Sequence, residues 1–215
     1  MEKIKILFAH RFFKILKWVF LILLGLYLIL VAVRVVHFFN LDKTNAQVEK
    51  IHSTRLQLAD VMGDNLPPDP GDLADKTVAG VDVNKNGIRD DVELAVFKEY
   101  PNSAKTRAVL LQYALALQME VIQPMVDTTT VTEIITEQGR ADTCIADTLI
   151  PRKSPESSRN YSDVIKIDAF VNFVKDKQFN TEARKIAHKD FIKNLRSFGD
   201  STNETCDIDI LKLQN

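Results

Sequence analysis

Residues 82–93, with the sequence DVNKNGIRDDVE, carry oxygen-bearing side chains at the spacing of a metal-binding loop. At positions 1, 3, 5, 9 and 12 of a twelve-residue loop, these side chains are Asp82, Asn84, Asn86, Asp90 and Glu93. Gly87 stands at position 6, so the segment satisfies the pattern D-x-D/N-x-D/N-G-x5-E in full. Hard oxygen ligands in this number favour calcium, whereas magnesium prefers a smaller shell that keeps more water.

Each position of such a loop has a physical task. Alternate residues turn their side-chain oxygens inward, and the glycine takes the sharp bend that wraps the chain around an ion. Position 7, which is Ile88 here, contributes its backbone carbonyl, and the final glutamate binds through both carboxylate oxygens. We therefore predict a metal site made of the five side chains and the Ile88 carbonyl, with Ca2+ as its ion.

The segment resembles the loop of an EF-hand, and more closely the lone calcium loops of dockerin and thrombospondin type 3 repeats. The resemblance covers twelve of the 215 residues, so it implies a site and not a fold. Position 8, usually apolar and paired with a second loop, is Arg89, and no second copy of the pattern occurs in the chain. An EF-hand has a helix before its loop, whereas the residues after the proline run are expected to be extended. A single static site is expected rather than a paired sensor.

A turn followed by a helix would account for part of this pattern without any ion. Asn86 and Gly87 form a common turn pair, and the acidic residues after them are favourable in the first turn of a helix. Neither preference explains why Asp82 and Asn84 also fall in register with the loop.

The first forty residues differ from the rest in their apolar composition. Residues 18–33, WVFLILLGLYLILVAV, carry no charge, and apolar residues on both sides extend the segment to residues 12–39. A helix of about 20 apolar residues spans a bilayer, and Lys17 and Arg34 can extend their charges to the lipid headgroups. We predict a transmembrane anchor over residues 12–39, in contact with the lipid bilayer.

Flanking charges predict the orientation of this anchor. The first 17 residues contain five basic residues, whereas only Arg34 and Lys43 follow closely behind the apolar run. Basic residues favour the cytoplasmic side, so residues 1–11 are expected in the cytoplasm and the chain after Asn40 in the periplasm. A cleaved signal peptide is the alternative, but the apolar run is long and the stretch VAVRVVHFFN offers no small-residue cleavage site.

Charge and cysteine content bear on the function of the exported part, residues 40–215. The chain has 28 basic and 29 acidic residues, of which six and one lie in the first 39 positions, leaving a net charge of −6 after them. This acidic balance argues against nucleic-acid binding. Cys144 and Cys206 are the only cysteines, and in an oxidising compartment we predict that they form a disulfide. The alternative, a catalytic thiol, lacks a recognisable sequence signature.

Helical patterns dominate the exported part, so the predicted fold class is all-α. Residues 40–62 are expected to form a membrane-proximal helix, and residues 63–81 an extended linker, because three prolines fall within positions 67–70. Several helices are expected to fill a helical domain over residues 94–215. Further expectations are helix caps at Asn102 or Ser103, at Thr128–Thr130 and at Asn180 or Thr181, a helix stop at Gly199, and a short strand within residues 207–213.

The function that fits these features best is a non-enzymatic, membrane-anchored module that binds an envelope or membrane protein. It resembles single-pass proteins of bacterial inner membranes. The alternative is an envelope enzyme that acts on glycan or cell-wall material, which would need two converging carboxyl groups. The sequence contains no G-x-S-x-G, H-E-x-x-H or C-x-x-C motif, and we predict no catalytic residue.

Overall fold

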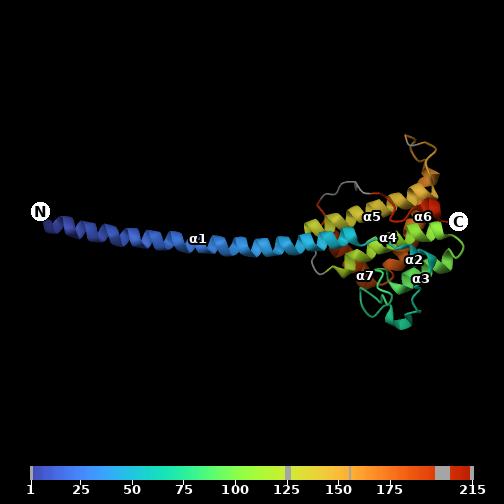
Figure 1. Cartoon of the computed structure of the whole chain (residues 1–215), viewed down its shortest axis with the longest axis horizontal. Helices are drawn as coiled ribbons and strands as arrows, with labels where there is room; N and C mark the ends of the chain where they lie inside the picture. Colours follow the sequence, from blue (N-terminus) through green and yellow to red (C-terminus); the bar gives the residue numbers. More distant parts are fainter. Residues whose placement is uncertain (1, 124–126, 155, 197–203, 214–215) are drawn as a thin grey trace. The chain divides into compact units, whose positions relative to one another are not determined.

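A computed structural model describes residues 2–123, 127–154, 156–196 and 204–213, with side chains from Phe13 on (Figure 1). Within these residues there are seven α-helices, two short 3-10 helices and no strand, which confirms the predicted all-α class. The chain divides into two units, residues 1–46 and residues 47–215, which we describe separately. We call residues 47–215 the head.

The first helix, α1 (Glu2–Ser53), contains the apolar segment. From Phe13 on it is long and apolar enough to cross a membrane, and its apolar window is not buried against other parts of the protein. Helix α1 continues past residue 39 because residues 40–53 contain neither proline nor glycine. A separate helix over residues 40–62 is not formed: α1 ends at Ser53, and a short helix α2 (Leu58–Met62) follows.

Residues 54–57, which we call the α1–α2 junction, interrupt the helical path at the start of the head. The hydroxyl of Thr54 donates to the carbonyl of Lys50 at 2.7 Å, a local bond that competes with continued helix. Helix α2 then begins where the backbone N–H of Gln57 donates to the carboxylate of Asp60 at 3.1 Å. Polar side chains therefore set both boundaries of the junction.

The head is built around α4 (Ala104–Ile122), whose sequence is apolar on nearly every side and whose residues are almost all buried. Tyr113 and Met119 of this helix lie in the core, as expected. Helix α4 contacts α2, α3 (Asp90–Glu99), α5 (Thr128–Leu149), α6 (Tyr161–Gln178) and α7 (Glu182–Ile192). Figure 1 shows the shorter helices gathered around it.

Short polar side chains cap the N-termini of the four helices α4 to α7. Ser103 caps α4 by accepting a hydrogen bond from the amide of Thr106, and Thr181 caps α7, both as predicted. Helix α5 begins earlier than expected, because Asp127 rather than a threonine accepts the bond from the amide of Thr130. The acidic side chain takes the cap position, and the threonines lie in the first helical turn.

The linker and the C-terminal tail contain little regular structure. Residues 63–81 are non-helical apart from one 3-10 turn, η1 (Gly71–Leu73). The tail forms a second 3-10 turn, η2 (Ile210–Lys212), where the sequence suggested a strand. Helix α7 ends at Ile192, and the expected stop at Gly199 lies outside the described residues. The predicted disulfide between Cys144 and Cys206 is confirmed, with an S–S distance of 2.02 Å.

Candidate metal site

The loop at residues 82–93 bends sharply at Gly87 and packs against the central helix. Gly87 has a φ of +86°, and a Cβ atom built there would lie 2.7 Å from Cδ1 of Leu115. Among the described non-glycine residues only Lys85 has a positive φ, at 58°. The glycine at position 6 is therefore required both by its backbone conformation and by the contact with α4.

The side chains in the first half of the loop fold back onto its own backbone. Asp82 Oδ2 accepts a hydrogen bond from the amide of Gly87 at 3.0 Å. Asn84 Oδ1 accepts from the amide of Asn86 at 3.3 Å, and Asn86 Oδ1 accepts from the amide of Ile88 at 2.9 Å. These bonds hold three oxygen-bearing side chains, two residues apart, against the loop that encloses them.

Asp90 joins the end of the loop to its beginning. Its carboxylate oxygens lie 3.0 and 3.2 Å from the amide nitrogen of Val83, and its own amide donates to the carbonyl of Val81 at 2.9 Å. Burial raises the pKa of the Asp90 carboxyl, the bond from Val83 opposes this effect, and the charges of Asp82 and Asp91 add to it. The loop thus gathers negative charge in a place shielded from water.

Glu93, in the first turn of α3, is the most deeply buried acid of the loop. Its side chain is fully buried, and Oε2 accepts hydrogen bonds from the amide groups of Asn84 and Asn86 at 3.0 and 3.1 Å. Burial raises the pKa of Glu93 to about 7, although the two amide bonds lower it and Asp60 and Asp90 raise it. Near neutral pH this carboxyl group therefore lies close to its titration midpoint.

Two buried carboxylate oxygens of the loop have no hydrogen-bond partner: Asp82 Oδ1 and Glu93 Oε1. A buried polar atom without a partner is costly, and the cost is larger when the group is charged. A divalent cation bound between them would satisfy both oxygens and offset the charge. The donors available here are carboxylate, amide and carbonyl oxygens, a set that fits a hard cation such as calcium.

The structure thus joins the predicted ligand residues by hydrogen bonds within one short loop. It does not gather their acidic side chains around a common point. Among the described residues, no group of three or more histidine, cysteine, aspartate or glutamate side chains is placed so that it could hold a metal ion. Two asparagine amides bond directly to the glutamate at position 12. The hydrocarbon side chain of Ile88 is fully buried in the core. Its backbone carbonyl is the only group of this residue that could bind a metal ion.

Arg89, directly after the expected carbonyl ligand, anchors the loop to another part of the head. Its side chain is fully buried, and it binds the carboxylate of Asp91 through Nε and Nη2, at 2.5 and 2.9 Å. The same guanidinium donates to the carbonyls of Lys177 and Gln178 at 2.6 and 3.0 Å. These carbonyls end α6, where a positive charge is favourable.

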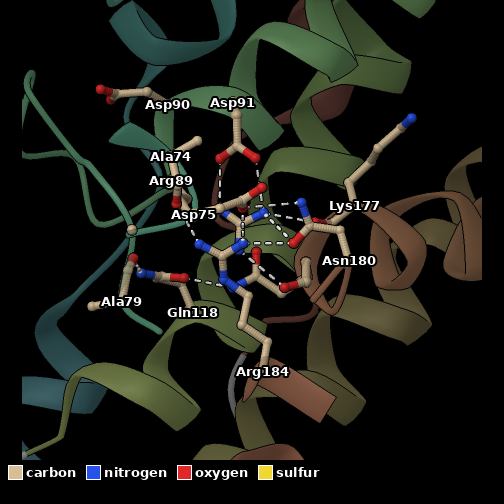
Figure 2. A network of polar contacts seen from close by, with 12 residues as sticks. Ala74, Asp75, Ala79, Arg89, Asp90, Asp91, Gln118, Lys177, Asn180 and Arg184 are labelled. Carbon is tan, nitrogen blue, oxygen red and sulfur yellow. Dashed lines mark hydrogen bonds and ion pairs between the residues drawn. The ribbon is translucent and has the colours of Figure 1, made fainter. Parts of the chain in front are cut away.

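A second buried arginine, Arg184 of α7, holds the linker before the loop. It donates to the carbonyls of Ala74, Thr77 and Val78 and to the side chains of Asp75 and Asn180. Figure 2 shows the guanidinium groups of Arg184 and Arg89 meeting beside Asn180, whose Oδ1 accepts from both. We call Arg89 and Arg184 the two-arginine clamp.

Glutamine side chains complete this attachment of the linker. Gln118 of α4 donates to the carbonyl of Ala79 at 2.7 Å, and its own oxygen accepts from Gln178 at 2.5 Å. Both glutamines are almost fully buried. The segment just before the loop is thus bonded directly to α4 and α7, and Gln118 connects it to α6 through Gln178, although the segment has little regular structure of its own.

A separate network of charges surrounds Glu137 of α5. This nearly buried carboxylate accepts from Arg55 and Arg140, each at 2.8 Å, and lies 3.2 Å from Nδ1 of His52. The other ring nitrogen of His52 lies 3.1 Å from the carboxylate of Glu133. The network connects the end of α1 and the α1–α2 junction with α5.

A third polar contact joins α7 to the central helix. Nδ1 of His188 lies 2.6 Å from Oε2 of Glu120, whose side chain is fully buried, and Oε1 of Glu120 accepts from Gln138 at 2.7 Å. Phe179 stacks on the histidine ring, with 4.4 Å between the ring centroids. Both glutamate oxygens are thus engaged, and the arrangement holds α4, α5 and α7 together.

Sequence reasoning found the loop but missed the charged networks around it. The loop pattern marks Arg89 only as a departure at position 8, and no pattern in the sequence singles out Arg184 or Glu137. The arginine at position 8 does not reveal its burial, because a buried arginine needs a partner. That partner lies 88 residues away and could not be identified from spacing.

No family model matches the chain, and no curated protein or solved structure shows significant similarity to it. The structure itself therefore defines the class of protein. It is an all-helical head that follows one long apolar helix near the N-terminus, with a disulfide between Cys144 and Cys206.

Proposed function

We propose that this protein is a membrane-anchored, exported helical binding module whose head is stabilised by one calcium ion in the loop of residues 82–93. The observation that carries the proposal is the pair of buried, unpartnered oxygens on Asp82 and Glu93. They stand at the first and last positions of a loop whose sequence has the spacing of calcium ligands. Burying these charged oxygens without a partner is unfavourable, and a bound cation would give both of them a favourable interaction.

The proposed ligands are the side chains of Asp82, Asn84, Asn86, Asp90 and Glu93 with the carbonyl of Ile88. The Oδ1 atoms of Asn84 and Asn86 each accept one backbone hydrogen bond, and the second lone pair of each amide oxygen is available to the ion. Three carboxylates give the loop enough negative charge for calcium, and we expect a dissociation constant of roughly 0.1–1 mM. Calcium at tenfold that concentration would stabilise the head by about 1.4 kcal/mol.

The ion would connect parts of the head that meet at the loop. Glu93 lies in α3, and Gly87 packs on Leu115 of α4. The amide of Asn84 reaches out to the linker and donates to the carbonyl of Asn65 at 3.0 Å. Calcium would therefore order the proline-rich linker against α3 and α4, so its role here is structural.

The proposed location is the periplasmic face of an inner membrane, with residues 12–39 in the bilayer and the N-terminus in the cytoplasm. Five basic residues in the first 17 positions support this orientation. The disulfide supports it independently, because such bonds persist in oxidising compartments outside the cytoplasm. The partner that we propose is an envelope or membrane protein bound by the head, and in-situ cross-linking in native membranes tests for it.

Calcium titration of the full-length protein in detergent micelles tests the metal site. After removal of metal with a chelator, we expect heat of binding and a higher melting temperature with calcium, and a weaker effect with magnesium. Glu93→Gln should abolish both responses, because it removes one charge and one of the unpartnered oxygens. The matched control is Glu99→Gln, the same substitution at an exposed position of α3, and it should respond like the original protein. An unchanged calcium response in Glu93→Gln would refute the site.

A further inference from the structure

The covalent and charged attachments of the C-terminal tail, residues 204–213, meet at one short segment, while its apolar residues Ile208, Ile210 and Leu213 pack against the core. Cys206 forms the disulfide with Cys144 of α5, and the next residue, Asp207, is buried at its carboxylate. Gln112 of α4 brackets the same segment, because its amide donates to the carbonyl of Thr205 at 2.8 Å and its oxygen accepts from the amide of Asp207 at 2.9 Å. The disulfide and these hydrogen bonds therefore hold the tail at the same three residues, 205–207.

Asp207 holds the α1–α2 junction. One carboxylate oxygen accepts from the backbone amide of Leu56 at 3.0 Å, and the other lies 3.3 Å from Nη1 of Arg55. The junction has lost the hydrogen bonds of regular helix, so this amide obtains its partner from the tail. The tail thus lies across the point where α1 ends within the head.

Asp207 also completes a balanced set of charges, of which Arg140, Glu137 and Asp207 are buried and Arg55 is partly exposed. Arg140 donates to Asp207 at 2.6 Å and to Glu137 at 2.8 Å, and Arg55 contacts the same two carboxylates. Two arginines are thus matched by two acids. If the tail left, two arginines would face one carboxylate, and the arrangement would lose both its charge balance and its bond to Leu56.

The two sulfur atoms that retain the tail differ in exposure. Cys144 is fully buried in the core. Cys206 is only half-buried and lines a groove of about 610 Å3 on the head, together with Lys105 of α4, Thr148 of α5 and the neighbouring tail residues. A thiolate must approach a disulfide sulfur directly in order to attack it. Among the residues that the structure describes, the groove thus gives a reagent access to the bond from the Cys206 side, whereas Cys144 is enclosed by the core.

We propose that the tail is a redox-controlled strap: reductants attack the disulfide at Cys206, and its opening releases residues 204–213 from the α1–α2 junction. The bonds of Asp207 to Arg55, Arg140 and Leu56 are then no longer supported by a covalent bond at the neighbouring residue. Loss of the covalent attachment lowers the effective concentration of Asp207 at the junction.

The chemistry of opening is thiol–disulfide exchange with a dithiol as the reductant. A thiolate of the dithiol bonds to Cys206 Sγ while the bond to Cys144 breaks, and Cys144 leaves with the electron pair and takes up a proton. The second thiol of the dithiol then displaces Cys206 in the same way. The dithiol ends as a disulfide, and both cysteines end as thiols.

The direction of attack can be tested on the unmodified full-length protein in detergent micelles. Brief exposure to 2-mercaptoethanol, followed by an acid quench and peptide mass spectrometry, shows which cysteine carries the mixed disulfide. We expect the adduct on Cys206, in at least about tenfold excess over Cys144, because the attacked sulfur must be accessible. Equal adducts, or an excess on Cys144, would overturn this part of the proposal.

Release of the strap can be tested by amide hydrogen exchange on the same protein before and after reduction with dithiothreitol. We expect exchange in the junction and the tail to accelerate at least about tenfold, with little change in α6. Asp207→Asn, with the disulfide intact, should accelerate exchange in the junction as well. Asp209→Asn is the matched control, because Asp209 is half-exposed and pairs with Lys212 instead. Unchanged exchange in the junction after reduction would overturn the strap, and so would uniform acceleration across all helices.

Discussion

The side chain of Arg89 passes directly over Gly80. A Cβ atom built at Gly80 would lie 2.2 Å from Cδ and 2.7 Å from Cγ of Arg89, distances at which atoms cannot coexist. Gly80 also has a φ of +71°, a conformation that side chains other than glycine rarely adopt. Because Gly80 has no side chain, the side chain of Arg89 can cross it and bind the carbonyls at the end of α6.

Gly80→Ala should destabilise the head, because the new methyl group forces Arg89 out of its bonds with the carbonyls of Lys177 and Gln178. We expect the free energy of unfolding to fall by roughly 2–4 kcal/mol, from backbone strain and a displaced buried charge together. Urea unfolding of the full-length protein, followed by circular dichroism, measures the loss.

Gly71→Ala is the control for this substitution. Gly71 also has a positive φ, at +51°, but nothing lies within 4 Å of a Cβ atom built there. Only the backbone strain should remain, at about 1 kcal/mol. Similar losses in the two variants would show that the contact between Gly80 and Arg89 does not matter.

Arg184→Lys should also destabilise the head, although it preserves the charge. A lysine ammonium cannot reproduce the planar fork that reaches the carbonyls of Thr77 and Val78 and the side chain of Asp75. We expect a loss of roughly 3 kcal/mol in the free energy of unfolding, because several backbone carbonyls lose hydrogen bonds from a charged donor. Arg152→Lys, at a largely exposed salt bridge with Asp147, should cost less than about 1 kcal/mol.

The sequence predicted those features that depend on local spacing. The helices of the head, the caps at Ser103 and Thr181 and the disulfide between Cys144 and Cys206 all follow from short-range patterns or from simple pairing. The α1–α2 junction did not, because residues 54–57 contain neither glycine nor proline. Local bonds of Thr54 and Asp60 mark its two boundaries, whereas the amide of Leu56 between them finds its partner in the distant Asp207.

The surroundings of the candidate site were less accessible to sequence reasoning. The register of Asp82 through Glu93 could be read from spacing alone, and the structure bonds these residues to one another. Arg89 and Arg184 could not be identified as buried, because arginine is normally an exposed residue. Their burial results from carbonyl groups at the end of α6 and in the linker, which come together only in the folded head.

The buried carboxyl of Glu93 should make the stability of the metal-free protein depend on pH. Its pKa is raised from 4.5 to about 7 in the folded head, so the folded state binds this proton more tightly than the unfolded state. The contribution of Glu93 to the free energy of unfolding is therefore greatest below about pH 4.5. It is lost as the pH rises towards 7. The full loss would be about 3 kcal/mol.

Urea unfolding between pH 4.5 and 7.5 in the presence of a chelator measures this dependence. Glu93→Gln cannot ionise and should flatten the profile over the same range, whereas Glu99→Gln should retain the slope of the original protein. A slope that persists in Glu93→Gln would assign the pH dependence to other acids, such as Asp142, whose pKa is also raised by burial.

The orientation of the anchor should depend on the basic residues before it, and the disulfide offers a readout. Replacing the five basic residues among the first 17 by glutamine removes the charge asymmetry around the apolar segment. A larger fraction of chains should then place the head in the cytoplasm, where thiols stay reduced. Alkylation of Cys144 and Cys206 with a maleimide polymer, without added reductant, resolves reduced from oxidised heads on a gel. The control neutralises five exposed lysines of the head and should leave the oxidised fraction unchanged. If the N-terminal variant also stays fully oxidised, these five charges do not set the orientation of the anchor.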